Sequence, residues 1–141
     1  MQWVSEAKYI ENRNRSPSLK KEQHAEIATA YDYMWEHAKD EFHKQRGKGP
    51  GDTDTLILAT ALVLDIAVVT DDQDMIEMAE SFEVKQMSSL ELMKLMVTEN
   101  HINMNKVSQV VQQWQFEDET PNKNWRKQYR EVFGASPPKY P

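Results

Sequence analysis

The fold is decided by the letters GDTDTLILATAL over residues 51–62, followed by AVVTDDQD over residues 67–74. Both stretches join an apolar run to carboxylates, which stand before the first run and after the second. The aspartates concerned are Asp52, Asp54, Asp71, Asp72 and Asp74. Carboxylates gathered where secondary-structure elements end supply the hard oxygen ligands that Mg²⁺ or Mn²⁺ prefers. This part of the chain therefore predicts an acidic metal site beside a buried core.

The composition is that of one ordinary globular domain. The chain has 141 residues, 39% of them hydrophobic and 28% charged, which is enough to build one core. It contains no cysteine, so disulfides and thiolate metal sites are excluded. The longest apolar run, residues 56–69, is interrupted by Thr60 and Asp65 and is shorter than a membrane span. The first residues lack a secretory signal pattern, and we expect a cytoplasmic protein.

The net charge of −6 is unevenly distributed. Residues 52–99 carry 11 acidic against 2 basic side chains, whereas residues 121–141 carry 5 basic against 1 acidic. An acidic chain does not favour nonspecific clamping of nucleic acid, because that needs many phosphate-neutralising cations. An acidic metal-binding centre flanked by basic segments remains compatible with this distribution.

The spacing of apolar residues predicts a long helix over residues 19–45 and a turn rich in glycine over 47–51. Residues 53–64 are apolar almost all round, so we expect a buried helix there. Ser88 and Glu91 form the pattern of a capping box at the start of the helix 90–97. The other expected elements are strands at 66–70 and 82–87 and helices at 72–81, 103–116 and 122–133; residues 3–15 fit either a strand running into a helix or helix throughout.

This alternation of helices and strands predicts an α/β fold with a parallel sheet flanked by helices. We expect residues 1–99 to form that α/β domain and residues 100–141 to add C-terminal helices and a tail. Ligands of such sheets bind beyond the carboxyl ends of the strands, where Asp71, Asp72 and Asp74 would lie.

The order of Asp54, the segment Ala59-Thr60-Ala61-Leu62 and the pair Asp72 and Asp74 resembles the second half of PIN-domain nucleases. The resemblance covers residues 51–95 and, more weakly, 1–15. This family includes the toxin ribonucleases of bacterial toxin–antitoxin pairs. Its members are metal-dependent phosphodiesterases with three or four acidic residues around Mg²⁺ or Mn²⁺. The resemblance implies a PIN-like fold and an endoribonuclease activity.

By the resemblance, Asp54 and Asp72 are the catalytic acids, and Asp54, Asp72, Asp74 and Glu6 are the metal ligands, with Glu11 as a reserve for Glu6. The family's first acid belongs to an opening strand that the sequence does not contain. Either the chain starts after that strand, as a truncated form, or the protein lacks it. The alternative function is therefore a catalytically inactive PIN-like domain that binds partners or acts as a scaffold.

Each candidate also has a structural interpretation. Asp54 is a natural helix cap, and Asp72 and Asp74 suit the first turn of a helix, where the helix dipole favours acids. We assign Asp52 and Asp71 to capping and solvation. The basic residues Arg126, Lys127 and Arg130 are candidates for binding nucleic acid, although a solvated helix face is the default interpretation. The expected partners are an RNA substrate, an antitoxin-like protein and a second copy that dimerises through the helix 19–45.

Overall fold

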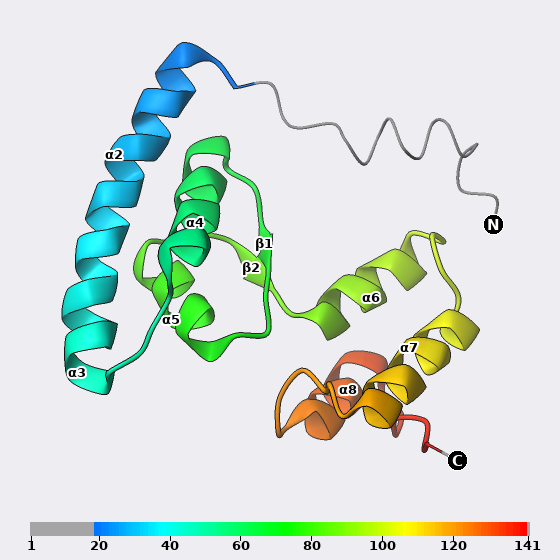
Figure 1. Cartoon of the computed structure of the whole chain (residues 1–141). Coiled ribbons are helices and arrows are strands. Elements are labelled where there is room, and N and C mark those ends of the chain that lie inside the picture. The colour runs from blue at the N-terminus through cyan, green and yellow to red at the C-terminus, as the bar shows by residue number, and fades with distance from the viewer. Residues whose placement is uncertain (1–18, 141) are drawn as a thin grey trace.

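The computed structural model describes residues 19–140, and this part of the chain is mostly helical (Figure 1). The predicted α/β fold with a PIN-like sheet is wrong, because the sheet has only two strands of two residues each. The elements are α2 (Lys21–Ala38), the π-helical turn η1 (Lys39–His43), α3 (Lys44–Arg46), α4 (Asp52–Leu64), β1 (Val68–Val69), α5 (Gln73–Ser81), β2 (Gln86–Met87), α6 (Ser89–Thr98), α7 (Met104–Glu117) and α8 (Trp125–Phe133).

The long helix predicted over residues 19–45 is confirmed, since α2, η1 and α3 follow one another without a break. Its buried side chains include Ile27, Met34, Ala38 and Phe42, which recur at helical spacing and make one face of the rod apolar. The rod ends at Gly47, whose φ of 73° lies in the left-handed region that glycine adopts without steric cost.

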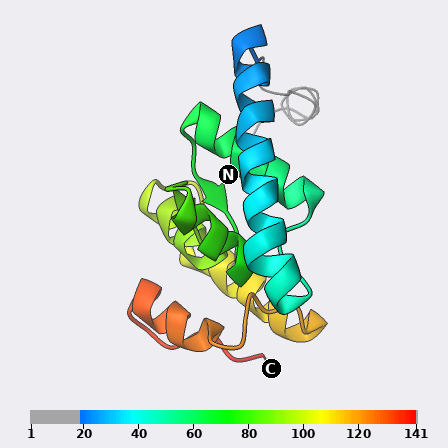
Figure 2. The ribbon, with the colours of Figure 1, turned by 90° about the vertical axis from the view of Figure 1, so that its left-hand side faces the viewer.

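Helix α4 packs against α2 (Figures 1 and 2). Leu58 and Ala59 of α4 are fully buried, and they belong to the same apolar core as Met34 and Ala38 of α2. The expectation that α4 is buried all round is wrong, because Leu56 is 49% and Ile57 45% exposed. One neighbouring helix covers only one side of α4, so its remaining apolar side chains face outward.

Strands β1 and β2 are parallel, with Val68 opposite Gln86 and Val69 opposite Met87. Helix α5 forms the crossover between them, as parallel strands require. Only Gln86 and Met87 of the predicted strand 82–87 are a strand. Phe82 and Glu83 form a turn instead, and Glu83, with a φ of 57°, interrupts an extended backbone. The apolar runs of the sequence therefore predicted longer strands than the chain forms, because a β-branched run becomes a strand only where a neighbouring segment pairs with it.

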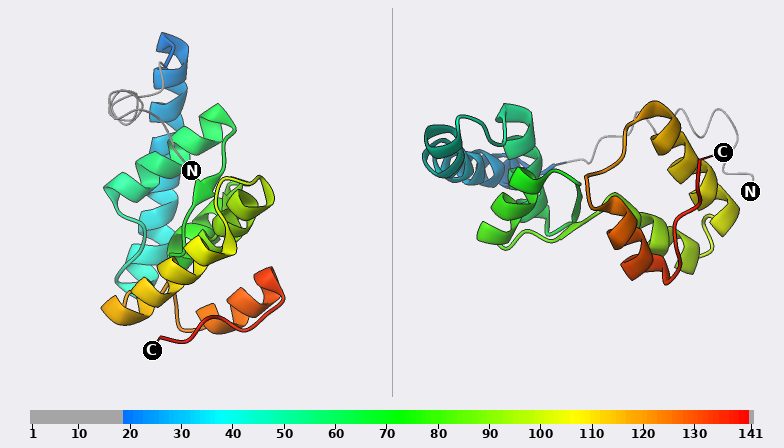
Figure 3. Two further views of the ribbon diagram at one scale, coloured as in Figure 1. Left: turned by 90° about the vertical axis from the view of Figure 1, so that its right-hand side faces the viewer. Right: turned by 90° about the horizontal axis from the view of Figure 1, so that it is seen from below.

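The helices form two groups that follow one another along the chain (Figures 1 and 3), and each group has its own apolar core. The first joins α2, α4 and α5 and includes Met34, Leu58 and Met78. The second joins α6, α7 and α8 around Leu90 and Trp125. Within residues 19–140, no helix is both long and apolar enough to cross a membrane.

Candidate functional site

Asp72 caps helix α5. Its carboxylate accepts a hydrogen bond of 2.9 Å from the backbone N–H of Met75, and its own N–H donates to the Thr70 hydroxyl at 3.1 Å. These contacts satisfy a free donor of the first helical turn. The structural interpretation of Asp72 therefore accounts for its position.

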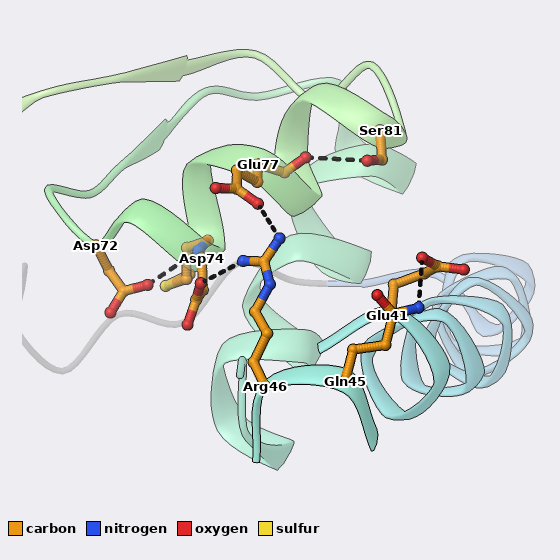
Figure 4. A network of polar contacts seen from close by, with 8 residues as sticks. Glu41, Gln45, Arg46, Asp72, Asp74, Glu77 and Ser81 are labelled. Atoms are coloured by element: carbon orange, nitrogen blue, oxygen red, sulfur yellow. Dashed lines mark hydrogen bonds and ion pairs between the residues drawn. The ribbon is translucent and has the colours of Figure 1, made fainter. Parts of the chain in front are cut away.

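Asp74 lies in the first turn of α5 and pairs with Arg46 of α3 (Figure 4). The guanidinium donates to Asp74 at 3.1 Å and to Glu77 at 2.9 Å, and it lies 4.7 Å from the centre of the Phe42 ring. The hydrogen bond with Glu77 raises the pKa of Arg46 above its usual value. A metal ion at Asp74 would have to compete with this cation for the same carboxylate.

Helix α4 begins after Gly51, and both Asp52 and Asp54 lie in its first turn. Neither is the N-cap, which is Gly51, so the prediction that one of them caps the helix is wrong. Asp52 instead accepts a hydrogen bond from the Tyr31 hydroxyl of α2, and this bond raises the pKa of Tyr31. Asp54 is half-buried, in a turn where the helix dipole favours a negative charge.

Asp71 holds the end of β1 to the start of α6. Its carboxylate accepts hydrogen bonds from the Ser89 backbone N–H, at 3.0 Å, and from the Ser89 hydroxyl. Asp71 is therefore not the cap of the helix that follows it, since Asp72 caps α5 and Ser88 caps α6. It accepts instead the N–H of the first residue of α6. The contact links the segment that follows β1 to the segment that follows β2.

Between residues 19 and 140, no group of three or more histidine, aspartate or glutamate side chains could hold a metal ion together. Glu6 and its reserve Glu11 lie outside the described residues. The acidic metal site of Asp54, Asp72, Asp74 and Glu6 therefore stays a prediction.

A polar pocket of about 280 Å³ lies beyond the carboxyl ends of the strands. Asp71 and Ser88 line it from the strand ends, and Lys123, Asn124 and Gln128 line it from α8 and the loop before it. A pocket at this edge agrees with the place where ligands of parallel sheets bind. Its amide-rich wall was missed from the sequence, because Asn122 and Asn124 indicated only a helix start.

The basic residues predicted to bind nucleic acid lie on the exposed side of α8. Arg126, Lys127 and Arg130 are all exposed, opposite the buried Trp125 and Tyr129. The Arg126 guanidinium lies 4.7 Å from the centre of the Trp125 ring. These basic side chains are accessible to an anionic partner. Solvation of an exposed helix face also accounts for them within the described chain.

An apolar surface lies where α4 meets β1, and we call it the α4–β1 face. It forms a groove of about 790 Å³. Leu56 and Ile57 of α4, Ile66 before β1 and Val69 of β1 are between 45% and 50% exposed. None of the residues lining the groove is ionisable: Leu56, Ile57, Thr60, Ala61, Ile66, Ala67, Val68 and Val69. This exposed apolar groove is a candidate surface for an interaction.

One edge of β1 borders the same groove. The N–H of Val68 donates to Lys85 and that of Thr70 to Met87, both at 2.9 Å. Because successive residues of a strand direct their backbone groups to opposite sides, Ala67 and Val69 direct theirs away from β2. Among residues 19–140, β1 pairs with β2 alone, so this edge offers hydrogen-bonding groups to a further strand.

Comparison of the chain with protein-family models, with curated proteins and with solved structures found no match. The resemblance to PIN-domain nucleases therefore rests on the residues quoted for it and stays an interpretation.

Proposed function

We propose that the protein is a binding or scaffold domain that docks a protein partner on the α4–β1 face. The observation that carries this proposal is the combination of four half-exposed aliphatic side chains with a strand edge that no other strand within residues 19–140 pairs with. A partner in extended conformation can add a strand to such an edge, using backbone hydrogen bonds for affinity and side-chain pockets for specificity.

Covering these four side chains would supply part of the driving force for binding. Fully burying an aliphatic side chain stabilises by about 1.5–3 kcal/mol, so covering the exposed half of each contributes about 1 kcal/mol. Leu56, Ile57, Ile66 and Val69 together therefore contribute about 4 kcal/mol, to which the edge hydrogen bonds add. This gain is of the size needed to offset part of the entropic cost of association.

Site-specific photo-crosslinking in the cells that produce the protein tests this function. A photoreactive residue replacing Ile57 is expected to form protein adducts. The same residue replacing Tyr33, which is 72% exposed on α2, is the matched control and is expected to form none. Equal yields at the two positions, or no adduct at Ile57, would refute the proposal.

The second candidate function is a metal-dependent endoribonuclease that acts in the cytoplasm with Mg²⁺ or Mn²⁺. Asp71, Asp72 and Asp74 follow β1 closely, and Asp71 lines a polar pocket at the same sheet edge, which favours this function. Divalent ions held there would lower the pKa of bound water and neutralise charge on the scissile phosphate. Arg126, Lys127 and Arg130 are the candidates for contacting RNA, and an antitoxin-like protein is the corresponding partner.

Calorimetric titration with Mn²⁺ and an RNA cleavage assay test this second candidate. Asp72→Asn combined with Asp54→Asn is expected to abolish both the heat of Mn²⁺ binding and the cleavage of RNA, while an asparagine at position 72 still caps α5. Asp65→Asn is the control, because Asp65 lies in an exposed turn whose left-handed backbone suits asparagine. Cleavage that survives the double variant would exclude the mechanism.

A further inference from the structure

We propose that the carboxylate of Asp71 is a latch that fixes the orientation of the two helix groups, which turn relative to each other about Ser88 when the latch is released. The first group comprises residues 19–87 and the second residues 88–140. This inference goes beyond the binding function proposed above and does not depend on what covers the α4–β1 face. It concerns the junction at the carboxyl ends of β1 and β2.

The apolar packing of the two helix groups is separate (Figures 1 and 3). The buried residues of the first core run from Ile27 to Val84 and those of the second from Leu90 to Tyr129, and no described residue is common to both cores. The helix pairs that pack most extensively are α2 with α4 and α6 with α8, and each pair lies within one group. Groups that do not share a large apolar interface are expected to move relative to each other unless polar contacts hold them.

Ser88 is the pivot between the two groups. The carbonyl of Met87 accepts the N–H of Thr70 at 2.9 Å, so the peptide before Ser88 belongs to the sheet. The carbonyl of Ser88 accepts the N–H of Leu92 at 3.0 Å, so the peptide after Ser88 belongs to α6. The two backbone torsions of Ser88, with φ of −78° and ψ of 165°, therefore set the orientation of one group relative to the other. Hinges lie at such terminal positions of secondary-structure elements.

Asp71 joins the two sides of this pivot. It follows Thr70 and so belongs to the first group, and its carboxylate accepts the Ser89 backbone N–H at 3.0 Å and the Ser89 hydroxyl. Among residues 19–140, no other hydrogen bond or ion pair joins the two groups. The carboxylate also faces the N-terminus of α6, where the helix dipole favours a negative charge. Both hydrogen bonds restrain the torsions of the residue between the sheet and α6.

The polar pocket of about 280 Å³ lies at the same junction. Asp71 and Ile76 line it from the first group, and Lys123 and Gln128 line it from the second. A turn of the groups about Ser88 changes the distance between these two walls. The latch therefore also sets the shape of the pocket.

Distances between pairs of nitroxide labels, measured on the full chain by pulsed electron paramagnetic resonance, test the latch. The chain has no cysteine, so the labels attach only at introduced cysteines. Tyr33→Cys on α2 and Asn105→Cys on α7, both at exposed positions, report the distance between the groups. The parent is expected to give one narrow distance distribution. Asp71→Ala is expected to broaden that distribution about twofold or more, because the groups then sample several orientations about Ser88.

Two controls distinguish motion about a hinge from a loss of structure. Asp74→Ala removes a neighbouring aspartate whose ion pair with Arg46 lies within the first group, so it is expected to leave the distance between the groups unchanged. Asn105→Cys with Lys127→Cys places the labels on α7 and α8 and measures a distance within the second group. That distribution is expected to stay narrow in Asp71→Ala.

Ser89→Ala is a milder variant, because it removes the hydroxyl but keeps the backbone N–H that donates to Asp71. It is expected to broaden the distribution between the groups less than Asp71→Ala does. The inference is overturned if Asp71→Ala leaves this distribution unchanged, if Asp74→Ala broadens it equally, or if the distance within the second group broadens as well. None of these outcomes bears on adduct formation at position 57, so the proposed binding function is tested separately.

Discussion

Replacing Leu58 by alanine tests the central feature of this structure, the two-sided character of α4. Leu58 is fully buried against α2, whereas its neighbour Ile57 is 45% exposed on the α4–β1 face. Removing a fully buried leucine side chain leaves a cavity and costs about 3–5 kcal/mol. Ile57→Ala removes a similar side chain that is only about half covered, so we expect a cost of roughly 1 kcal/mol.

Urea unfolding monitored by circular dichroism measures both values. With a slope near 2 kcal/mol per molar, Leu58→Ala is expected to lower the midpoint by about 1.5 M or more, and Ile57→Ala by about 0.5 M. Protein concentrations low enough to keep the chain monomeric remove any contribution of self-association to Ile57. Equal losses for the two variants would refute the reasoning, because they would mean that α4 is buried on both sides.

Three further predictions concern local contacts. Asp72→Ala removes the cap of α5 and is expected to lower the free energy of unfolding by about 1 kcal/mol, measured by thermal denaturation. Gly49→Ala places a methyl group against the Phe42 side chain and is expected to cost about 1–3 kcal/mol through overpacking. Asp52→Asn is expected to lower the pKa of Tyr31 toward 10.0 in a spectrophotometric titration. Because folding raises the pKa of Tyr31, the contribution of the neutral Tyr31 hydroxyl to stability is complete below pH 10. That contribution is lost as the pH rises through the pKa of the folded state.

Each of these predictions has a control within the chain. Asp72→Asn keeps a capping oxygen and is expected to remain near the parent stability. Gly51→Ala is the control for Gly49, because an added Cβ at Gly51 meets no atom within 4 Å. The reasoning about Tyr31 fails if its titration is unchanged by Asp52→Asn but shifts with Asp54→Asn.

The helices were predictable because their signals are local. The capping box of Ser88 and Glu91 is confirmed, with Ser88 accepting from the Glu91 N–H at 3.1 Å. The apolar spacing of residues 19–45 likewise predicted a helix whose buried face is now seen. In both cases the deciding contacts join residues three or four positions apart, so the pattern of side chains is sufficient.

The candidate site was less predictable. The aspartates were recognised as a group, but no local pattern shows that Arg46 reaches Asp74 across 28 positions, or that Asp71 reaches Ser89 across 18. The exposed side of α4 was missed for the same reason, because an apolar sequence does not reveal how many neighbours are available to cover it.

By itself, the sequence determined approximately where the helices lie, that the helix 19–45 has an apolar face, and the acidic character of residues 52–99. Only the tertiary structure decided that the sheet is limited to two short parallel strands, that Asp71 and Asp74 hold elements together, and that an uncharged apolar groove lies between α4 and β1. The physical reason is that helix hydrogen bonds and caps close within one turn of chain, whereas strand pairing, ion pairs and burial depend on which distant segments arrive beside them.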